Sequence, residues 1–99
     1  MASSDEKKAP ALDFNALVLS LGSSVIVHLG EAPDPTTGQK RDQPEITMAQ
    51  QSIDLLAMLQ EKTRGNLTAE EARFLENMLF DLRMLFVQVS KRQSPAKSP

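Results

Sequence analysis

The amino-acid sequence predicts an all-α domain of three helices: a first helix, a long loop and an antiparallel helical hairpin. Two observations predict the hairpin. Apolar residues recur at helical spacing over residues 69–90, and the pair Gly65-Asn66 provides a short turn before them. A third observation predicts the first helix, because residues 14–29 are mostly apolar and include no Asp, Glu, Lys or Arg. We expect helices at about 14–29, 45–63 and 69–90 in one domain over residues 12–89.

The first helix has an N-cap residue in Asp13 and is apolar around nearly all of its circumference. Such a helix is usually central and buried. Its main apolar stripe consists of Phe14, Leu17, Val18, Leu21, Val25 and Leu29. Ala16, Ser20 and Ser24 form a row of small residues, and Val27 lies on the far side together with Ala16. We expect the hairpin to cover one side of this helix and a second subunit to cover the other.

A membrane span is the alternative for such an apolar helix. Sixteen residues at 1.5 Å each reach about 24 Å, which is short of the roughly 30 Å hydrocarbon core. The hydroxyl groups of the segment and the absence of a basic face also argue against membrane association.

His28 is the single histidine of the chain, and helical projection places it between Leu17 and Leu21. Its functional interpretations are a pH sensor or a metal ligand shared with a symmetry mate. The favoured interpretation is a histidine at the edge of the core, whose N–H groups meet free carbonyls at the helix C-terminus.

The loop that follows, Glu31 to Pro44, contains three prolines, and Asp34 to Gly38 is expected to form a turn.

The first helix of the hairpin carries a broad apolar face, which spans more than half of its circumference. Its members are Met48, Ala49, Ile53, Leu55, Leu56, Ala57 and Leu59. Gly65 is expected to adopt the left-handed conformation just past the end of this helix, where a Cβ is costly. The short turn makes the two hairpin helices antiparallel.

The second helix of the hairpin has the clearest pattern. Thr68 and Glu71 form a capping box, in which each side chain satisfies a backbone N–H at the helix start. No polar residue interrupts its stripe, so the stripe is a core face. Its members are Phe74, Leu75, Met78, Leu79, Leu82, Leu85, Phe86 and Val89.

Phe80, Met84 and Val87 form a second apolar row on the opposite side of this helix. The row is typical of a contact with a partner helix, most simply a second copy of the chain; scattered surface residues are the alternative.

Arg83 lies between the two apolar surfaces of this helix. We expect it to form a structural ion pair with Asp54 or Asp13 of another helix, and a binding role is the alternative.

Five segments of the chain resemble a known protein family. They are FNALVLSL at 14–21, HLGE at 28–31, IDLL at 53–56, EKTRGNLT at 61–68 and DLR at 81–83. Together they are similar to a family of small bacterial proteins catalogued as domain-of-unknown-function family 1844. The resemblance covers about residues 12–89, and the turn at 62–68 is its most specific part. It implies a bacterial origin and a short helical domain, and it implies no activity.

Composition narrows the functional classes. Ninety-nine residues make at most one domain, and the absence of cysteine excludes disulfides, thiol nucleophiles and thiolate metal sites. Residues 12–89 hold six Lys or Arg against eleven Asp or Glu, and residues 90–99 add three basic residues. We expect disordered tails at 1–11 and 90–99, the second of them basic. Neither this charge pattern nor the aromatic content suits nucleic-acid binding.

The sequence therefore predicts a non-catalytic interaction or scaffold module in the bacterial cytoplasm. We expect a homodimer formed through the first helix and the nearby apolar rows, with another protein as the second kind of partner. Catalytic motifs and clusters of metal ligands are lacking, so we expect no enzyme, no cofactor and no metal. The alternatives are a small-ligand-binding protein with a pocket near His28 and Arg83, and a peripheral membrane adaptor that uses the first helix.

Overall fold

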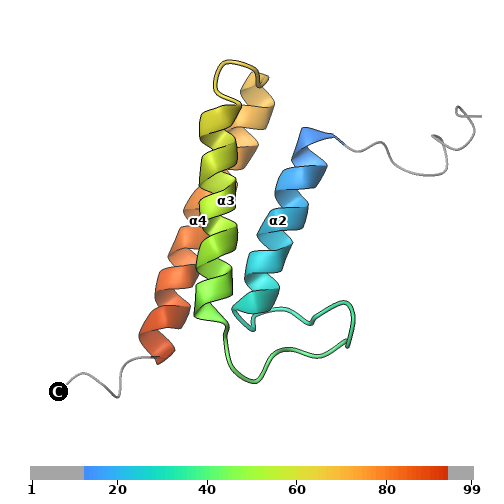
Figure 1. The fold of residues 1–99 in the computed structure, drawn as a ribbon, viewed down its shortest axis with the longest axis vertical. Helices are drawn as coiled ribbons and strands as arrows, with labels where there is room; N and C mark the ends of the chain where they lie inside the picture. The colour runs from blue at the N-terminus through green and yellow to red at the C-terminus, as the bar shows by residue number, and fades with distance from the viewer. Residues whose placement is uncertain (1–12, 94–99) are drawn as a thin grey trace, which may run out of the picture.

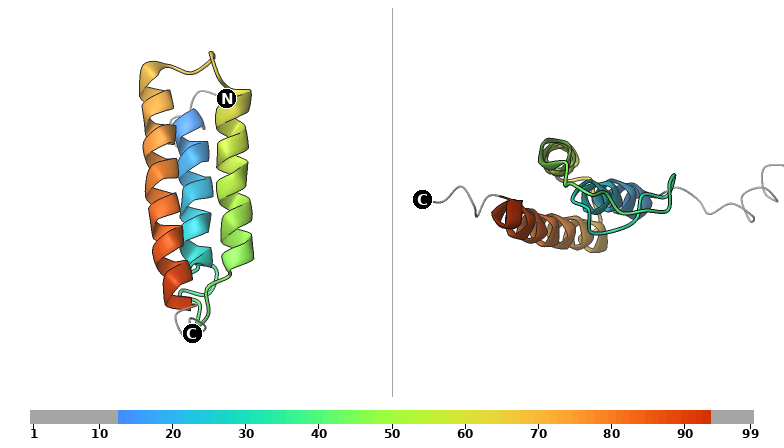
Figure 2. Two further views of the ribbon diagram at one scale, coloured as in Figure 1. Left: turned by 90° about the vertical axis from the view of Figure 1, so that its left-hand side faces the viewer. Right: turned by 90° about the horizontal axis from the view of Figure 1, so that it is seen from below.

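The computed structural model describes residues 13–93. It contains three helices: α2 (Phe14–His28), α3 (Ile46–Lys62) and α4 (Ala69–Gln93). Neighbouring helices in the chain run antiparallel, and each helix packs against the other two (Figure 1, Figure 2). The predicted all-α fold with an antiparallel hairpin is confirmed. The tails predicted at 1–11 and beyond Gln93 lie outside the described residues.

Local hydrogen bonds fix both ends of α2. The Asp13 carboxylate accepts a hydrogen bond of 2.8 Å from the Ala16 amide, as an N-cap does. At the other end Gly30 has a φ of +79°. Its amide donates to the Val27 carbonyl at 2.9 Å, and the Glu31 amide donates to the Ile26 carbonyl at 3.0 Å. This pair of bonds is a Schellman motif, and it ends the helix at His28, one residue before the expected Leu29.

The hairpin turn follows its sequence pattern. The Thr68 amide donates to the Glu71 carboxylate at 2.9 Å, and the Glu71 amide donates to the Thr68 hydroxyl oxygen at 3.1 Å, so the capping box is confirmed. Gly65 has a φ of +88°, in the left-handed region expected of it. The Asn66 amide donates to the Thr63 carbonyl at 2.8 Å and closes the turn between α3 and α4.

Helix α4 is longer than predicted. The basic tail was expected to begin at Ser90, but the helix continues to Gln93. Lys91 and Arg92 favour a helix C-terminus, because cations interact well with the exposed carbonyls there. Arg92 also forms an ion pair of 2.9 Å with Glu31, which ties the last turn of α4 to the loop after α2.

One hydrophobic core joins the three helices. It consists of Val18, Val25, Leu29, Ala49, Ile53, Leu56, Leu75, Leu79, Leu82 and Val89. The predicted core stripe of α4 is confirmed, because its remaining members pack against this core. The broader stripes predicted for the other two helices are partly wrong: Leu17, Leu55 and Met48 are exposed by 46, 46 and 44%. In a bundle of three helices, only one face of each helix can contact the shared core.

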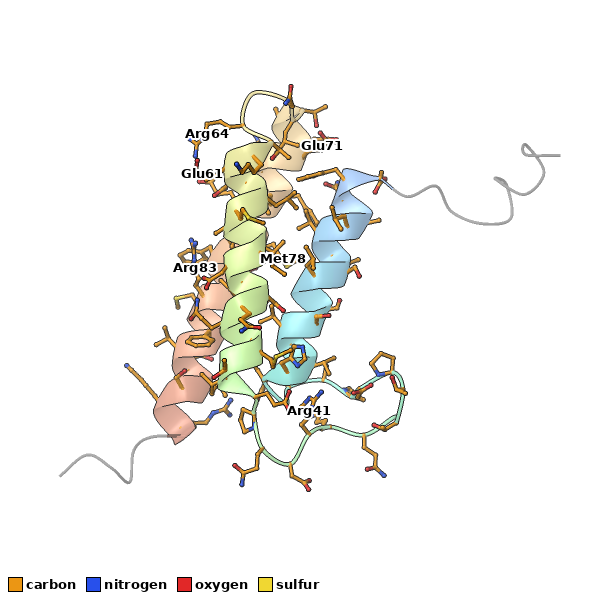
Figure 3. The ribbon with its side chains drawn as sticks, viewed as in Figure 1. Arg41, Glu61, Arg64, Glu71, Met78 and Arg83 are labelled. Atoms are coloured by element: carbon orange, nitrogen blue, oxygen red, sulfur yellow. The ribbon has the colours of Figure 1, made fainter. Side chains whose placement is uncertain are left out.

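Gly22 marks a close approach between α2 and α4. It is buried, and a Cβ built on it would lie 2.7 Å from the sulfur of Met78 (Figure 3 shows Met78 between the helices). The absence of a side chain at Gly22 therefore lets Met78 lie against the α2 backbone. This contact turns the Gly22 side of α2 toward the core, which rotates Leu17 outward relative to the predicted stripe.

The Gly22–Met78 contact predicts a graded response to substitution. Gly22→Ala should be nearly neutral, because alanine gains about 1 kcal/mol of helix propensity while the flexible end of Met78 shifts. Gly22→Leu should lower the free energy of unfolding by about 1–3 kcal/mol through overpacking. Urea unfolding followed by circular dichroism measures both changes. The double variant Gly22→Leu/Met78→Ala should regain part of the loss, and equal stability of the two Gly22 single variants would contradict the assignment.

Candidate functional site

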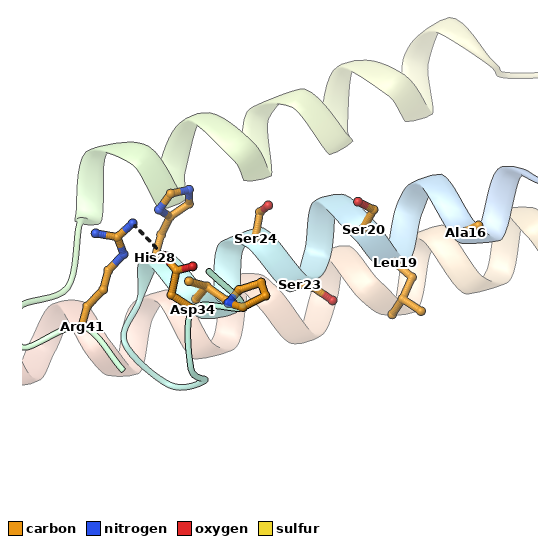
Figure 4. Close-up of a pocket in the computed structure, with 10 residues that line it drawn as sticks. Ala16, Leu19, Ser20, Ser23, Ser24, His28, Asp34 and Arg41 are labelled. Atoms are coloured by element: carbon orange, nitrogen blue, oxygen red, sulfur yellow. Dashed lines mark ion pairs between the residues drawn. The ribbon is translucent and has the colours of Figure 1, made fainter. Parts of the chain in front are cut away.

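The outer side of α2 forms the floor of an open groove of about 600 Å³. The predicted row of small residues lies in it: Ala16, Ser20 and Ser24 project from one side of the helix, and Leu19 and Ser23 from the other (Figure 4). The full lining is Ala16, Leu19, Ser20, Ser23, Ser24, Val27, His28, Asp34, Pro35 and Arg41. Small side chains thus leave room for another molecule over a helix that carries no charge between Phe14 and Val27.

The loop after α2 forms one wall of this groove. The turn predicted at Asp34 is confirmed: the Asp34 carbonyl accepts hydrogen bonds from the amides of Thr37 (3.2 Å) and Gly38 (2.7 Å). The Asp34 carboxylate accepts a further bond of 2.8 Å from the Thr36 amide. The Asp34 amide in turn donates to the Gln39 carbonyl at 2.9 Å. The segment therefore closes on itself, which positions Asp34 and Pro35 beside α2.

Polar groups meet at the His28 end of the groove. Arg41 lies 3.2 Å from a carboxylate oxygen of Glu45 and 3.9 Å from one of Asp34. Glu45 also connects the helices directly, since its amide donates to the His28 carbonyl at 2.7 Å. The groove thus ends at an ion-pair network that joins the loop to the first residues of α3.

The side chain of His28 is 17% exposed, as expected at the edge of a core. The prediction that the N–H groups of His28 bind free carbonyls at the helix C-terminus is wrong. Its Nδ1 lies 3.5 Å from a Glu45 carboxylate oxygen and makes no hydrogen bond. The Schellman motif at Gly30 uses the Ile26 and Val27 carbonyls, and the Glu45 amide takes the His28 carbonyl, so these acceptors are already engaged.

The second predicted surface lies on α4. Phe80, Met84 and Val87 are exposed by 64, 50 and 49%, so the row predicted opposite the core stripe faces outward. A hollow of about 250 Å³ lies beside it, lined by Glu76, Leu79, Phe80, Arg83 and, from α3, Gln60. A branched apolar side chain from another molecule would bury apolar surface in this hollow.

A third set of exposed apolar side chains lies on α3. Leu55 and Met58 line a shallow hollow of about 360 Å³ with Gln51 and Asp54, and Met48 is exposed on the same helix. Sequence reasoning assigned Met48 and Leu55 to the core face and gave no role to Met58. Its spacing of three residues from Leu55 was the signal that could have revealed this outer row.

The structure does not bring together His28, Asp54 and Arg83, the polar residues predicted to form a site or an ion pair. His28 lines the α2 groove and Arg83 lines the α4 hollow, so the predicted single pocket near both residues is wrong. Figure 3 shows the separation, with Arg83 on α4 and Arg41, which shares the groove with His28, at the loop. Within residues 13–92, Arg83 forms no ion pair with Asp54 or Asp13. Asp54 instead accepts a bond of 2.8 Å from Gln50, and Asp13 caps α2.

Over the described part of the chain, no group of three or more His, Cys, Asp or Glu side chains is arranged to hold a metal ion. Over the same residues, none of the helices combines the length and the apolar character needed to cross a membrane.

The chain matches a known protein family. A family model described as "Domain of unknown function (DUF1844)" matches residues 11–88, which include all of α2 and α3 and most of α4. No curated protein and no solved structure matches the chain.

The Asp34 turn predicts a pH dependence. Hydrogen bonds from the amide and hydroxyl of Thr36 hold the pKa of the Asp34 carboxyl below its ordinary value, with a smaller contribution from Arg41. Because the folded-state pKa is lowered, its stabilisation is complete above the unfolded-state pKa and is lost as the pH falls through the folded-state pKa. A carboxyl NMR titration should therefore find Asp34 below ordinary aspartates. Thr36→Ala removes the hydroxyl bond and keeps the amide bond, so it should raise this pKa in part, and by more than Arg41→Gln does. The reverse order would contradict the assigned contribution of the hydroxyl.

Proposed function

The chain belongs to the family described as domain of unknown function DUF1844, and because that description assigns no activity, we propose a function from the surfaces of the chain itself. The proposal is a non-catalytic protein–protein interaction module of the bacterial cytoplasm that associates with itself as a homodimer. Its candidate interfaces are the α2 groove and the α4 row Phe80, Met84 and Val87.

The observation that supports this proposal is that large apolar side chains remain exposed although the core between the helices is filled. Ten buried residues fill the seam between the helices, yet each helix also exposes large apolar side chains on its outer side. These are Leu17 and Leu19 on α2, Met48, Leu55 and Met58 on α3, and Phe80, Met84 and Val87 on α4. Rows of this kind, flanked by polar residues, are characteristic of surfaces that bind other proteins.

The composition of the α2 face supports the same proposal. Charged residues are depleted at the centre of protein–protein interfaces, and α2 carries none between Phe14 and Val27. Nucleic acids and anionic lipids, in contrast, select basic surfaces. An uncharged apolar face therefore favours a protein partner.

A small ligand in the α2 groove is the second candidate function. The groove combines an apolar wall from Leu19, Val27 and Pro35 with hydroxyl groups and with His28 and Arg41 at one end. Its volume of about 600 Å³ lies in the range of small-molecule sites. Its openness to solvent makes it better suited to a peptide or helix than to a fully enclosed metabolite.

The mass of the full chain in solution tests self-association. Sedimentation equilibrium should give a dimer, recorded with interference optics because the chain has no Trp or Tyr. Phe80→Glu and Ser20→Arg place a charge on the α4 row and in the α2 groove, respectively. Both positions are exposed, so circular dichroism should report an unchanged fold. We expect at least one variant to be monomeric; a monomeric wild-type chain, or an unchanged dimer in both variants, would contradict the proposal.

A thermal-shift panel separates the two candidate functions. If the groove binds a metabolite, a panel compound should raise the melting temperature of the wild-type chain, and Ser24→Trp, which fills the groove, should abolish that shift. We expect no compound to do so, because the proposed occupant is a protein. A shift that is lost in Ser24→Trp would favour the ligand-binding alternative.

A further inference from the structure

The outer row of α4 has the spacing of a helix–helix seam. Asn77, Phe80, Met84, Val87 and Lys91 follow one another at alternating intervals of three and four residues. This is the heptad spacing by which one helix packs along another. The core-facing side of α4 is occupied separately by Leu75, Leu79, Leu82 and Val89, so the outer row is not needed to hold the bundle together.

The hollow beside this row has the form of a receptor for one side chain. It lies where α3 and α4 meet: Gln60 lines it from α3, and Glu76, Leu79, Phe80 and Arg83 line it from positions i, i+3, i+4 and i+7 of α4, with the core residue Leu79 among them. In knobs-into-holes packing, four residues at this spacing surround the side chain that a facing helix inserts. The hollow measures about 250 Å³, which accommodates a branched aliphatic side chain.

We propose that α4 pairs with α4 of a second copy of this chain in an antiparallel seam, with the two-fold axis passing between Arg83 and Met84. Residues at equal distances from this point then face each other. Phe80 lies opposite the partner's Val87, which enters the hollow beside Phe80, and Met84 lies next to the axis. By symmetry Val87 enters the equivalent hollow of the partner, so one surface supplies both the knob and the hole.

The two Glu76–Lys91 pairs favour a second copy in the antiparallel direction, and they lie farther from the axis than Arg83, which approaches the partner's Arg83. In this register Glu76 lies opposite the partner's Lys91, and Lys91 lies opposite the partner's Glu76. Both residues are exposed, and neither forms an ion pair within residues 13–92 of its own chain. A parallel pair would place like charges opposite each other at both positions. Exposed ion pairs add little affinity, but they do select orientation.

The shapes of the two candidate interfaces favour α4 over α2 for this contact. The α2 surface is concave, with the Asp34–Arg41 loop as a wall at one end. Two such grooves cannot fill each other, whereas the α4 row is a ridge with a hollow beside it. The inference rests on the proposed self-association and narrows it to one surface, which leaves the α2 groove to a different protein.

Single cysteines test the seam sharply, because the full chain contains none. A disulfide forms between two copies only where their Cα atoms approach within about 7 Å, which in this arrangement occurs beside the two-fold axis. Met84→Cys should therefore form a covalent dimer on mild oxidation. The matched controls Leu55→Cys on α3 and Ser20→Cys in the α2 groove, both exposed, should remain uncrosslinked at the same protein concentration.

Charge reversal tests the register. Glu76→Lys and Lys91→Glu should each raise the dissociation constant of the dimer by about threefold or more, because each replaces two attractive pairs by repulsive ones. The double variant Glu76→Lys/Lys91→Glu should restore the wild-type value. Failure of the double variant to recover affinity would overturn the antiparallel register.

The outcomes separate this inference from the function on which it rests. A sedimenting dimer that crosslinks through Ser20→Cys or Leu55→Cys, and not through Met84→Cys, would overturn the α4 seam and leave self-association intact. A monomeric wild-type chain would overturn both. A dimer that crosslinks through Met84→Cys and recovers in the charge-swap variant supports both.

Discussion

The packing of α2 against the hairpin at Gly22 sets the orientation on which the outer surfaces depend. Met78 lies against the backbone of α2 there, because glycine leaves no side chain in its way. Val18 and Val25, one turn away on either side, are consequently buried, and the opposite side of α2 faces outward. Since α2 is apolar around most of its circumference, whichever side faces outward must be largely uncharged. The open groove follows from this constraint.

The loop between α2 and α3 turns that uncharged side into a shaped surface. Gly30 ends α2, and the Glu45 amide then bonds to the His28 carbonyl at 2.7 Å, so both ends of the loop are fixed to the same point of the bundle. Arg41, near the end of the loop, lies beside both Asp34 in its first part and Glu45 at the start of α3. These links hold the loop beside α2 as a wall of the groove. The polar network therefore contributes shape to the groove as well as local stability.

The features that the sequence predicted well depend on neighbours in the chain. The Asp13 cap, the Thr68–Glu71 box and the inner stripe of α4 each arise from residues three or four positions apart. The outward row of α4 followed from the same spacing. The rotation of each helix about its axis and the long-range contacts do not follow from residues close together in the chain. Leu17 was predicted to face the core, because the periodicity of α2 does not reveal that Met78 packs on Gly22. The contact of His28 with Glu45 depends on the path of the intervening loop, and the partner assigned to Arg83 failed for the same kind of reason.

The two outer surfaces differ in a way that suggests different tasks. The α4 ridge carries charges near both ends of its apolar row, so it can specify direction as well as contact. The α2 groove is uncharged along most of its floor and concave, which suits the convex face of another helix. In a pair joined through α4, the two α2 grooves remain free because they lie on a different helix. Such a pair would present two equal sites to a multivalent partner, and its avidity would exceed the affinity of either groove. A dimer of this kind would give the proposed scaffold role a physical basis.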